Sequence, residues 1–169
     1  MPTIGVAIAI PEPWAGVLQH QRASFGDFQA DAIPTHVTLV PPTRIDAELC
    51  EVQAHLAHVA STSTAFPIRL RGTATFRPTS PVVFVALSQG ISSCELLAEA
   101  VRQGPLRQEL PFPYHPHVTV AHHLSETALD HAYESLKDFD AAFDVRQFDL
   151  YVHGDDEVWR PIQTFQLAE

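Results

Sequence analysis

Residues 113–122 read PYHPHVTVAH, and the HVTV core of this stretch has a counterpart in residues 36–39, which read HVTL. In a chain with 10 histidines and 12 threonines, a His-x-Thr triplet is expected about 0.7 times by chance, so one copy carries little information. Two copies carry more, because both place aliphatic residues after the His and after the Thr, and both precede a helix-like segment. The pair of motifs therefore organises the prediction of both fold and function.

The size and composition of the chain predict one folded unit. With 169 residues and 46% hydrophobic residues, we expect a single domain over residues 1–169 that folds as a monomer. The apolar run at residues 4–10 is too short to span a bilayer and lacks a basic flank, so no membrane association is expected. Cys50 and Cys94 are far apart and predict no disulfide framework. A cytoplasmic protein is the expectation.

The charge balance narrows the class of partner. The chain has 20 acidic and 10 basic residues, which gives a net charge of −10. A protein with this charge repels long polyanions, so stable binding of long nucleic acid is not expected. A small phosphorylated nucleotide or a short RNA end remains a suitable partner, provided that local hydrogen-bond donors offset the overall field.

The same order of predicted helices and strands follows each of the two motifs. Each is a predicted strand followed by a helix, a long strand, a turn and a return strand, with the long strands at 66–76 and 143–152. Residues 66–69, FPIR, resemble residues 143–146, FDVR, at a spacing of 77 residues. Each half alone is short of core. The repeat therefore predicts two lobes related by a pseudo-two-fold axis, with both motifs in a central cleft.

Strand geometry predicts which motif side chains reach the cleft. Successive side chains of a strand point to opposite faces, so the His and the Thr of residues 36–39 share a face, roughly 7 Å apart. The two aliphatic residues then point into a lobe core, and residues 117–120 follow the same pattern. We expect the prolines at 41–42 to end the first motif strand.

Two imidazoles and two hydroxyls in one cleft suit phosphodiester chemistry. Near neutral pH one His, His36 or His117, can be a neutral general base while the other is a protonated general acid. The hydroxyls of Thr38 and Thr119 can donate to the non-bridging oxygens of a phosphate. Because no nucleophilic Cys or carboxylate and no Gly-rich loop accompanies them, the prediction is metal-free cleavage or formation of a phosphodiester, without a cofactor.

The paired HVTL and HVTV motifs, with PYHP before the second, resemble the 2H phosphoesterase superfamily, in particular its bacterial 2′-5′ RNA ligase-like members. The likeness extends over nearly the whole chain in element order. It implies an α+β, bilobal fold with two antiparallel β-sheets and flanking helices, acting on 2′,3′-cyclic phosphates or 2′-5′ linkages. By the same pattern, His36 and His117 would be the catalytic pair, and Thr38 and Thr119 would bind the phosphate.

The chain departs from this pattern just after the second motif. Many ligase-like relatives have an Arg there, and this chain has His122 and His123. The change disfavours a polynucleotide ligase, and His122 is either a replacement phosphate contact or a surface histidine. Tyr114 and Phe112 are candidates to stack on a base or sugar, and for Phe112 packing is the alternative.

Two further interpretations stay open at the level of sequence. One is a metal-dependent hydrolase built on His115, His117, His122 and His123, although no Asp or Glu lies within that run to complete the site. The other is a non-catalytic module that binds nucleotides or RNA ends in the same cleft. The residues leave open which His is the base, whether the protein joins or hydrolyses, and which phosphodiester is the substrate.

Overall fold

The computed structural model describes residues 2–27 and 30–169. The chain forms, in order, β1 (Thr3–Ala9), α1 (Trp14–Ser24), β2 (His36–Arg44), α2 (Leu49–Thr62), β3 (Phe66–Thr75), β4 (Val82–Gln89), α3 (Ile91–Val101), the 3-10 turn Gly104–Leu106, β5 (His117–His122), α4 (Glu126–Ser135), β6 (Asp140–Val145), β7 (Gln147–His153) and β8 (Trp159–Gln166). No helix among these described residues is both long and apolar enough to cross a bilayer.

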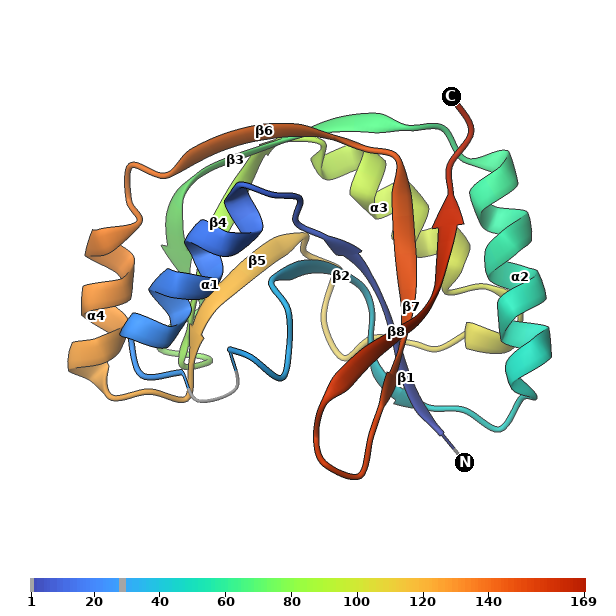
Figure 1. Cartoon of the computed structure of the whole chain (residues 1–169), viewed down its shortest axis with the longest axis horizontal. Coiled ribbons are helices and arrows are strands. Elements are labelled where there is room, and N and C mark those ends of the chain that lie inside the picture. The colour runs from blue at the N-terminus through green and yellow to red at the C-terminus, as the bar shows by residue number, and fades with distance from the viewer. Residues whose placement is uncertain (1, 28–29) are drawn as a thin grey trace.

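The strands form two four-stranded antiparallel sheets, in the orders β2-β1-β7-β8 and β5-β4-β3-β6. The first sheet packs with α2 and α3, and the second with α1 and α4, so that the molecule forms an arch between α2 and α4 (Figure 1). This arrangement confirms the predicted α+β, bilobal class with two antiparallel sheets and flanking helices.

The two lobes exchange helices. Helix α1 connects β1 and β2 of the first sheet, yet it packs against β5 of the second sheet, and α3 connects β4 and β5 but packs against β2. Figure 1 shows α1 beside α4, at the end of the arch opposite α2. Because each connecting helix completes the core of the other lobe, β2 and β5 are held against each other.

The boundaries of the repeat differ from the sequence expectation. Residues 143–152, predicted as one strand, belong to two strands, because the chain leaves the second sheet after Val145 and enters the first sheet at Gln147. Val145 and Phe148 are both buried, and this odd spacing breaks the alternation that one continuous strand requires. The similar segments 66–69 and 143–146 therefore pair directly, with Phe66 opposite Val145.

The prediction that prolines 41–42 end the first motif strand is wrong, because β2 continues to Arg44. An edge strand can accept proline, since one side of its backbone has no ladder partner. The ladder between β1 and β2 is irregular at this point, where Ile4 pairs with Thr43 and Val6 with Val40. The two prolines lie in this irregularity.

Candidate active site

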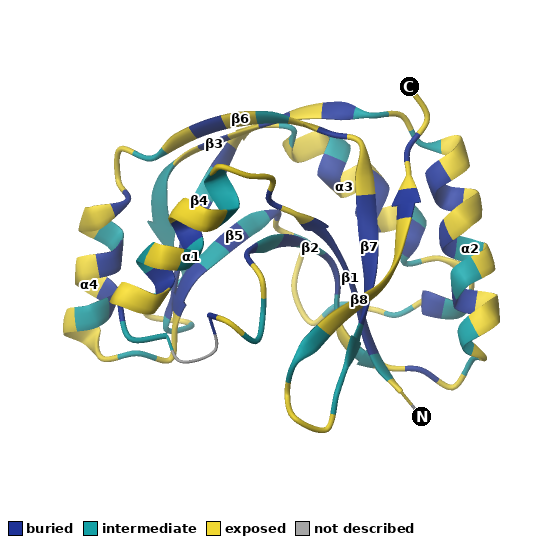
Figure 2. Ribbon diagram, in the orientation of Figure 1, coloured by how far each residue is buried: buried dark blue, intermediate teal, exposed yellow. Residues whose placement is uncertain are grey.

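The two motifs occupy equivalent places on facing edge strands. β2 is the edge of the first sheet, β5 is the edge of the second, and the two strands contact each other (Figure 1). Along both motifs buried residues alternate with half-buried ones, as the coloured ribbons show (Figure 2). The half-buried positions are His36, Thr38, His117 and Thr119, and the aliphatic residues between them are buried. Each His therefore shares a face with its Thr, as the alternation predicts.

Both motif imidazoles have the same tautomer. His36 Nδ1 lies 2.6 Å from the carbonyl oxygen of Pro34, and His117 Nδ1 lies 2.6 Å from the carbonyl oxygen of His115. A carbonyl oxygen only accepts, so each Nδ1 carries the hydrogen and donates it. In the neutral ring Nε2 then has a free lone pair. Each half of the site thus presents one nitrogen that can take up a proton.

The surroundings favour the neutral form of both rings. Burial lowers the pKa of His36 below 6.5, and the positive charge of Arg22 lowers it further, against the effect of the Pro34 hydrogen bond. Burial also lowers the pKa of His117, against the effect of its hydrogen bond to the His115 carbonyl, and the charges of His115 and His36 lower it further. The two rings lie close enough for the charge of His36 to lower the pKa of His117. Protonation of one ring therefore opposes protonation of the other.

An aromatic wall surrounds His117. Its ring centroid lies 5.1 Å from that of Phe76, at an interplanar angle of 87°, and 5.1 Å from that of Phe84. His115 packs on the same two phenylalanines, at 5.4 Å and 5.3 Å. Phe84 comes from β4 and pairs with Thr119, which explains why it reaches the motif. These rings remove one side of His117 from water, which is the desolvation that lowers its pKa.

A row of small and polar residues lies beside Thr38 instead. Thr38 pairs with Ala7 of β1, and Ala7 pairs on its other side with Asp149 of β7. Paired residues project from the same face, so Asp149 shares the face of Thr38, two strands and about 10 Å away. Its buried carboxylate accepts hydrogen bonds from Thr164 at 2.6 Å and from Tyr151 at 3.4 Å.

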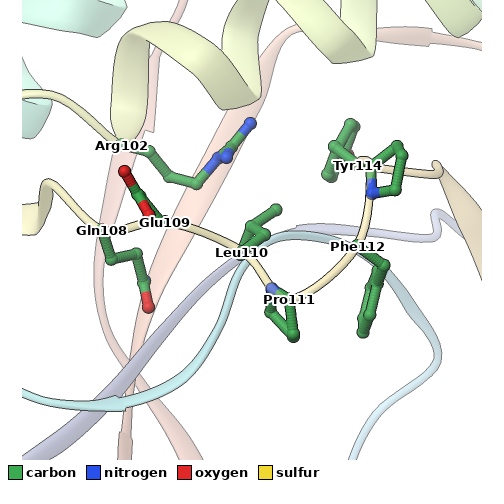
Figure 3. A pocket seen from close by; sticks show the side chains of 8 residues that line it. Arg102, Gln108, Glu109, Leu110, Pro111, Phe112 and Tyr114 are labelled. Atoms are coloured by element: carbon green, nitrogen blue, oxygen red, sulfur yellow. The ribbon is translucent and has the colours of Figure 1, made fainter.

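Tyr114 joins the two halves. Its hydroxyl donates to the carbonyl oxygen of Thr38 at 2.6 Å, and burial raises its pKa well above the ordinary value. The guanidinium of Arg102 lies 5.6 Å from the centre of its ring. The same tyrosine lines a hollow of about 540 Å³ with Arg102, Leu110 and Phe112, in which Phe112 points away from Arg102 (Figure 3). Substrate contact by Tyr114 stays a prediction.

His122 lies at the opposite end of β5 from His117. Five residue steps along the strand place them about 17 Å apart. The His122 side chain is exposed, its ring centroid is 3.7 Å from that of His123, and burial together with His123 lowers its pKa while Asp27 opposes this effect. Its predicted contact with substrate therefore requires a molecule longer than one phosphate group.

The histidines proposed for a metal site fall into two separate pairs. His115 packs beside His117 at 5.4 Å, whereas His122 and His123 stack at the far end of the strand. Across residues 2–27 and 30–169, no group of three or more His, Cys, Asp or Glu side chains is placed to hold a metal ion. The described side chains thus do not assemble the four-histidine site considered from sequence.

Several residues of the site have no signal in the sequence. Phe76 follows β3, Phe84 comes from β4, and Asp149 lies two strands away from Thr38. Arg22 comes from α1, which connects β1 and β2 of the first sheet but packs against β5 of the second. Asp149 is the exception, because it is a polar residue between the apolar Phe148 and Leu150. This alternation in the sequence indicates that its side chain lies on the cleft-side face of the strand. Locating the others requires the tertiary arrangement.

Comparison with known proteins identifies the family. Residues 10–157 match the family described as the 2'-5' RNA ligase superfamily. Because the match covers most of the sequence, the chain belongs to this superfamily, and the predicted likeness to 2H phosphoesterases is confirmed. A provisionally named phosphoesterase from Bacillus cytotoxicus is 26% identical over 142 residues, 81% of each chain, and one from Geobacillus kaustophilus is 27% identical over 136 residues, 79% of this chain and 78% of the relative.

Solved structures share the fold. A protein of Thermus thermophilus superposes with a TM-score of 0.69 at 22% identity, covering 98% of this chain and 97% of that one. LigT of E. coli, complexed with NADP+, superposes with a TM-score of 0.67 at 18% identity, with all of both chains covered. The solved structures thus show the fold, and the family together with the names of the relatives supports phosphoesterase activity.

Proposed function

We propose that the protein is a metal-independent phosphodiesterase that opens 2′,3′-cyclic phosphates or cleaves 2′-5′ linkages of a small nucleotide or short RNA end. The observation that favours this function most is the matched pair of imidazoles, each with Nδ1 donating to a carbonyl and Nε2 free. General acid–base catalysis needs two such nitrogens, one on each side of the phosphorus.

The reaction follows from this pair. The Nε2 of one His removes a proton from water as its oxygen attacks the phosphorus, and the bond from phosphorus to one ribose oxygen breaks. The other His, protonated at Nε2, gives its proton to that leaving oxygen. A cyclic phosphate and water thus yield a phosphomonoester and a free hydroxyl. The hydroxyls of Thr38 and Thr119 donate to the non-bridging oxygens, where negative charge grows.

Binding of the substrate favours protonation of one of the two histidines. Both His36 and His117 have lowered pKa values in the free protein, so both rings are neutral at pH 7. A bound phosphate is an anion a few ångströms from both rings and favours the charged form of one of them. Binding would thus convert two bases into one base and one acid.

Small nucleotides are the class that the site and the comparisons support. Structures of E. coli LigT have been solved in complex with 3'-AMP and with ATP. In this chain the net charge of −10 disfavours a long nucleic acid. With the phosphate at Thr38, a nucleoside extends over Ala7 to Asp149, whose carboxylate has lone pairs left for an amino or hydroxyl group of the ligand.

Single substitutions test the proposal. His36→Ala and His117→Ala should each lower the rate of hydrolysis of a 2′,3′-cyclic nucleotide by about 10²–10⁴-fold, because each removes one proton-transfer group. His58→Ala removes an exposed histidine of α2 and is the matched control, which should keep wild-type activity. Rates are measured with EDTA present, and circular dichroism confirms folding.

The alternatives predict different results. If both active-site variants hydrolyse at the wild-type rate, the acid–base assignment is wrong. If wild-type protein binds a 2′,3′-cyclic nucleotide but releases it unchanged, the protein is a binding module. If EDTA abolishes activity and zinc restores it, the reaction depends on a metal and the proposed mechanism fails.

A further inference from the structure

Arg22 is a buried arginine that no part of the proposed chemistry uses. It lies in the last turn of α1 with 6% of its surface exposed. Its Nη1 donates to the carbonyl oxygen of Ile33 at 2.7 Å and to the hydroxyl of Thr35 at 3.2 Å. Its Nε and Nη2 donate to one carboxylate oxygen of Asp27, at 3.3 Å and 3.2 Å. A buried guanidinium needs such partners, and this one is held on two sides.

Besides a longer hydrogen bond to Gln19 Oε1 at 3.5 Å, the Nη1 contacts bracket a single residue, Pro34. Ile33 precedes it and Thr35 follows it, and both are fixed by the same nitrogen. Pro34 has no amide hydrogen, so its peptide group gains no donor bond of its own. Its carbonyl oxygen is the acceptor for His36 Nδ1. The position of that oxygen therefore depends on the residues that Arg22 holds on either side.

We infer that Arg22 is the positioning residue of the first motif, which fixes the Pro34 carbonyl and thereby the orientation and tautomer of the His36 ring. This inference rests on the proposed function only for its effect on rate. Its effect on the ring is a property of the free protein. The guanidinium suits this task because its planar fork grips segment 33–35 and Asp27 at once, which a single ammonium cannot do.

Among the described residues, no arginine is hydrogen-bonded to the backbone just before His117 in the way that Arg22 is before His36. His117 Nδ1 also donates to the carbonyl two residues earlier, but Phe76 and Phe84 hold that ring by packing. Arg102, near the end of α3, is placed over the Tyr114 ring and donates to Ala98 instead of the backbone before His117. His36 thus depends on one polar anchor where His117 depends on an aromatic wall.

The charge of Arg22 has a second, measurable consequence. It lowers the pKa of His36, in addition to the larger effect of burial. The titratable groups found to interact with His36 within the described residues are Arg22 from α1 and His117 from β5, and Asp27 is the ion-pair partner of Arg22. Removing the positive charge leaves Asp27 nearby, so the pKa of His36 should rise toward 6.5. Keeping the charge should keep it low.

Two substitutions of Arg22 separate position from charge. In Arg22→Lys the charge remains and the fork is lost, so the pKa of His36 should stay low while the Nε2-protonated tautomer becomes populated. In Arg22→Gln both the charge and the fork are lost, so both tautomers of the His36 ring should be populated and the pKa of His36 should rise. Nitrogen-15 NMR of the histidine rings reads both quantities without substrate. With a 2′,3′-cyclic nucleotide, kcat should fall by about 10²-fold and KM should change little, as for a misplaced catalytic group.

Controls keep a general loss of stability apart from a loss of position. Arg69→Gln breaks an exposed ion pair with Asp140 and should change neither the His36 ring nor the rate. Thr35→Val removes one acceptor of Arg22 with little change in shape, and Thr35→Ser restores it. We expect the same tautomer change as in Arg22→Gln, but smaller, in the Val variant and none in the Ser variant. If Arg22→Gln does not fold, this pair provides the test.

The outcomes distinguish the inference from the proposed function. A folded Arg22→Gln, or failing that a Thr35→Val, in which the His36 tautomer and pKa equal those of the wild type would overturn the positioning role. A wild type that hydrolyses no phosphodiester would defeat the proposed function. In that case a changed His36 tautomer in the Arg22 variants would still support the inference.

Discussion

The His36 half and the His117 half of the site share one backbone arrangement and differ in what surrounds the ring. In both, Nδ1 donates to the carbonyl two residues earlier, and a half-buried Thr follows on the same face. Around His117 the neighbours are Phe76 and Phe84, whereas Arg22 lies near His36. The backbone thus repeats what acid–base chemistry needs from each half, and the surroundings can set the two histidines to different tasks.

The difference also extends along the sheets. Beside Thr119 lies Phe84, and beside Thr38 lies Ala7, followed by Asp149 on the next strand. A small side chain leaves room above the sheet, whereas a phenylalanine fills it. We therefore propose that the nucleoside lies over the first lobe and that the second lobe shields the phosphate from water. The predictions below test how far the halves are equivalent.

The largest effect concerns the two histidines together. If they act as one unit, the double variant His36→Ala/His117→Ala should be no slower than the slower single variant, within about threefold, because removal of either group already stops proton transfer. Rates of single-turnover hydrolysis of a 2′,3′-cyclic nucleotide give the comparison. A double variant slower by the product of both single effects would mean that each half acts independently.

The two threonines should have intermediate and similar effects. Thr38→Val and Thr119→Val each remove one hydroxyl donor to the phosphate, with a loss of about 10²-fold in kcat if both donate to growing charge. Thr38→Ser and Thr119→Ser retain the hydroxyl and serve as controls. If one valine variant keeps wild-type kcat, the phosphate is held by one half only, and the proposed symmetry of the site is wrong.

The smallest effect concerns the bond that joins the halves. Tyr114→Phe deletes the hydroxyl that donates to the Thr38 carbonyl and keeps the ring. We expect a loss of about 1 kcal/mol in the free energy of unfolding, which is typical of one hydrogen bond. Urea unfolding measures it, and Tyr133→Phe on α4 is the control. Unchanged stability would mean that this bond adds nothing to lobe contact.

The local pattern of the motifs was predictable because it depends on neighbours in the chain. Alternation along residues 36–39 and 117–120 follows from the pleat of a strand, and the repeat predicts that both strands face one cleft. The walls were not predictable, because they come from distant segments. Phe84 reaches His117 through strand pairing, and Arg22 reaches the first motif through its hydrogen bonds to Ile33 and Thr35.

Two local expectations failed for reasons of tertiary context. The prolines at 41–42 look like a strand end, but the edge position of β2 leaves one side of its backbone without a ladder and so accepts them. The run 143–152 looks like one strand, but the chain changes sheets between Val145 and Gln147. Neither sheet order nor edge position can be read from hydrophobic periodicity alone.

The most direct test of the paired-histidine claim is the pH dependence of kcat/KM for a 2′,3′-cyclic nucleotide in EDTA, which reports the free protein. The base must be unprotonated and the acid protonated, and the pKa values of His36 and His117 both lie below 6.5. The rate should therefore fall on the acid side as the base gains a proton, and on the alkaline side as the acid loses one, with that loss at a lower pH than for an ordinary histidine. We predict a bell with its maximum on the acid side of neutrality, which loses one limb in His36→Ala and the other in His117→Ala where residual rates permit. A profile that rises with pH to a plateau above 8 would contradict paired acid–base catalysis by these two residues.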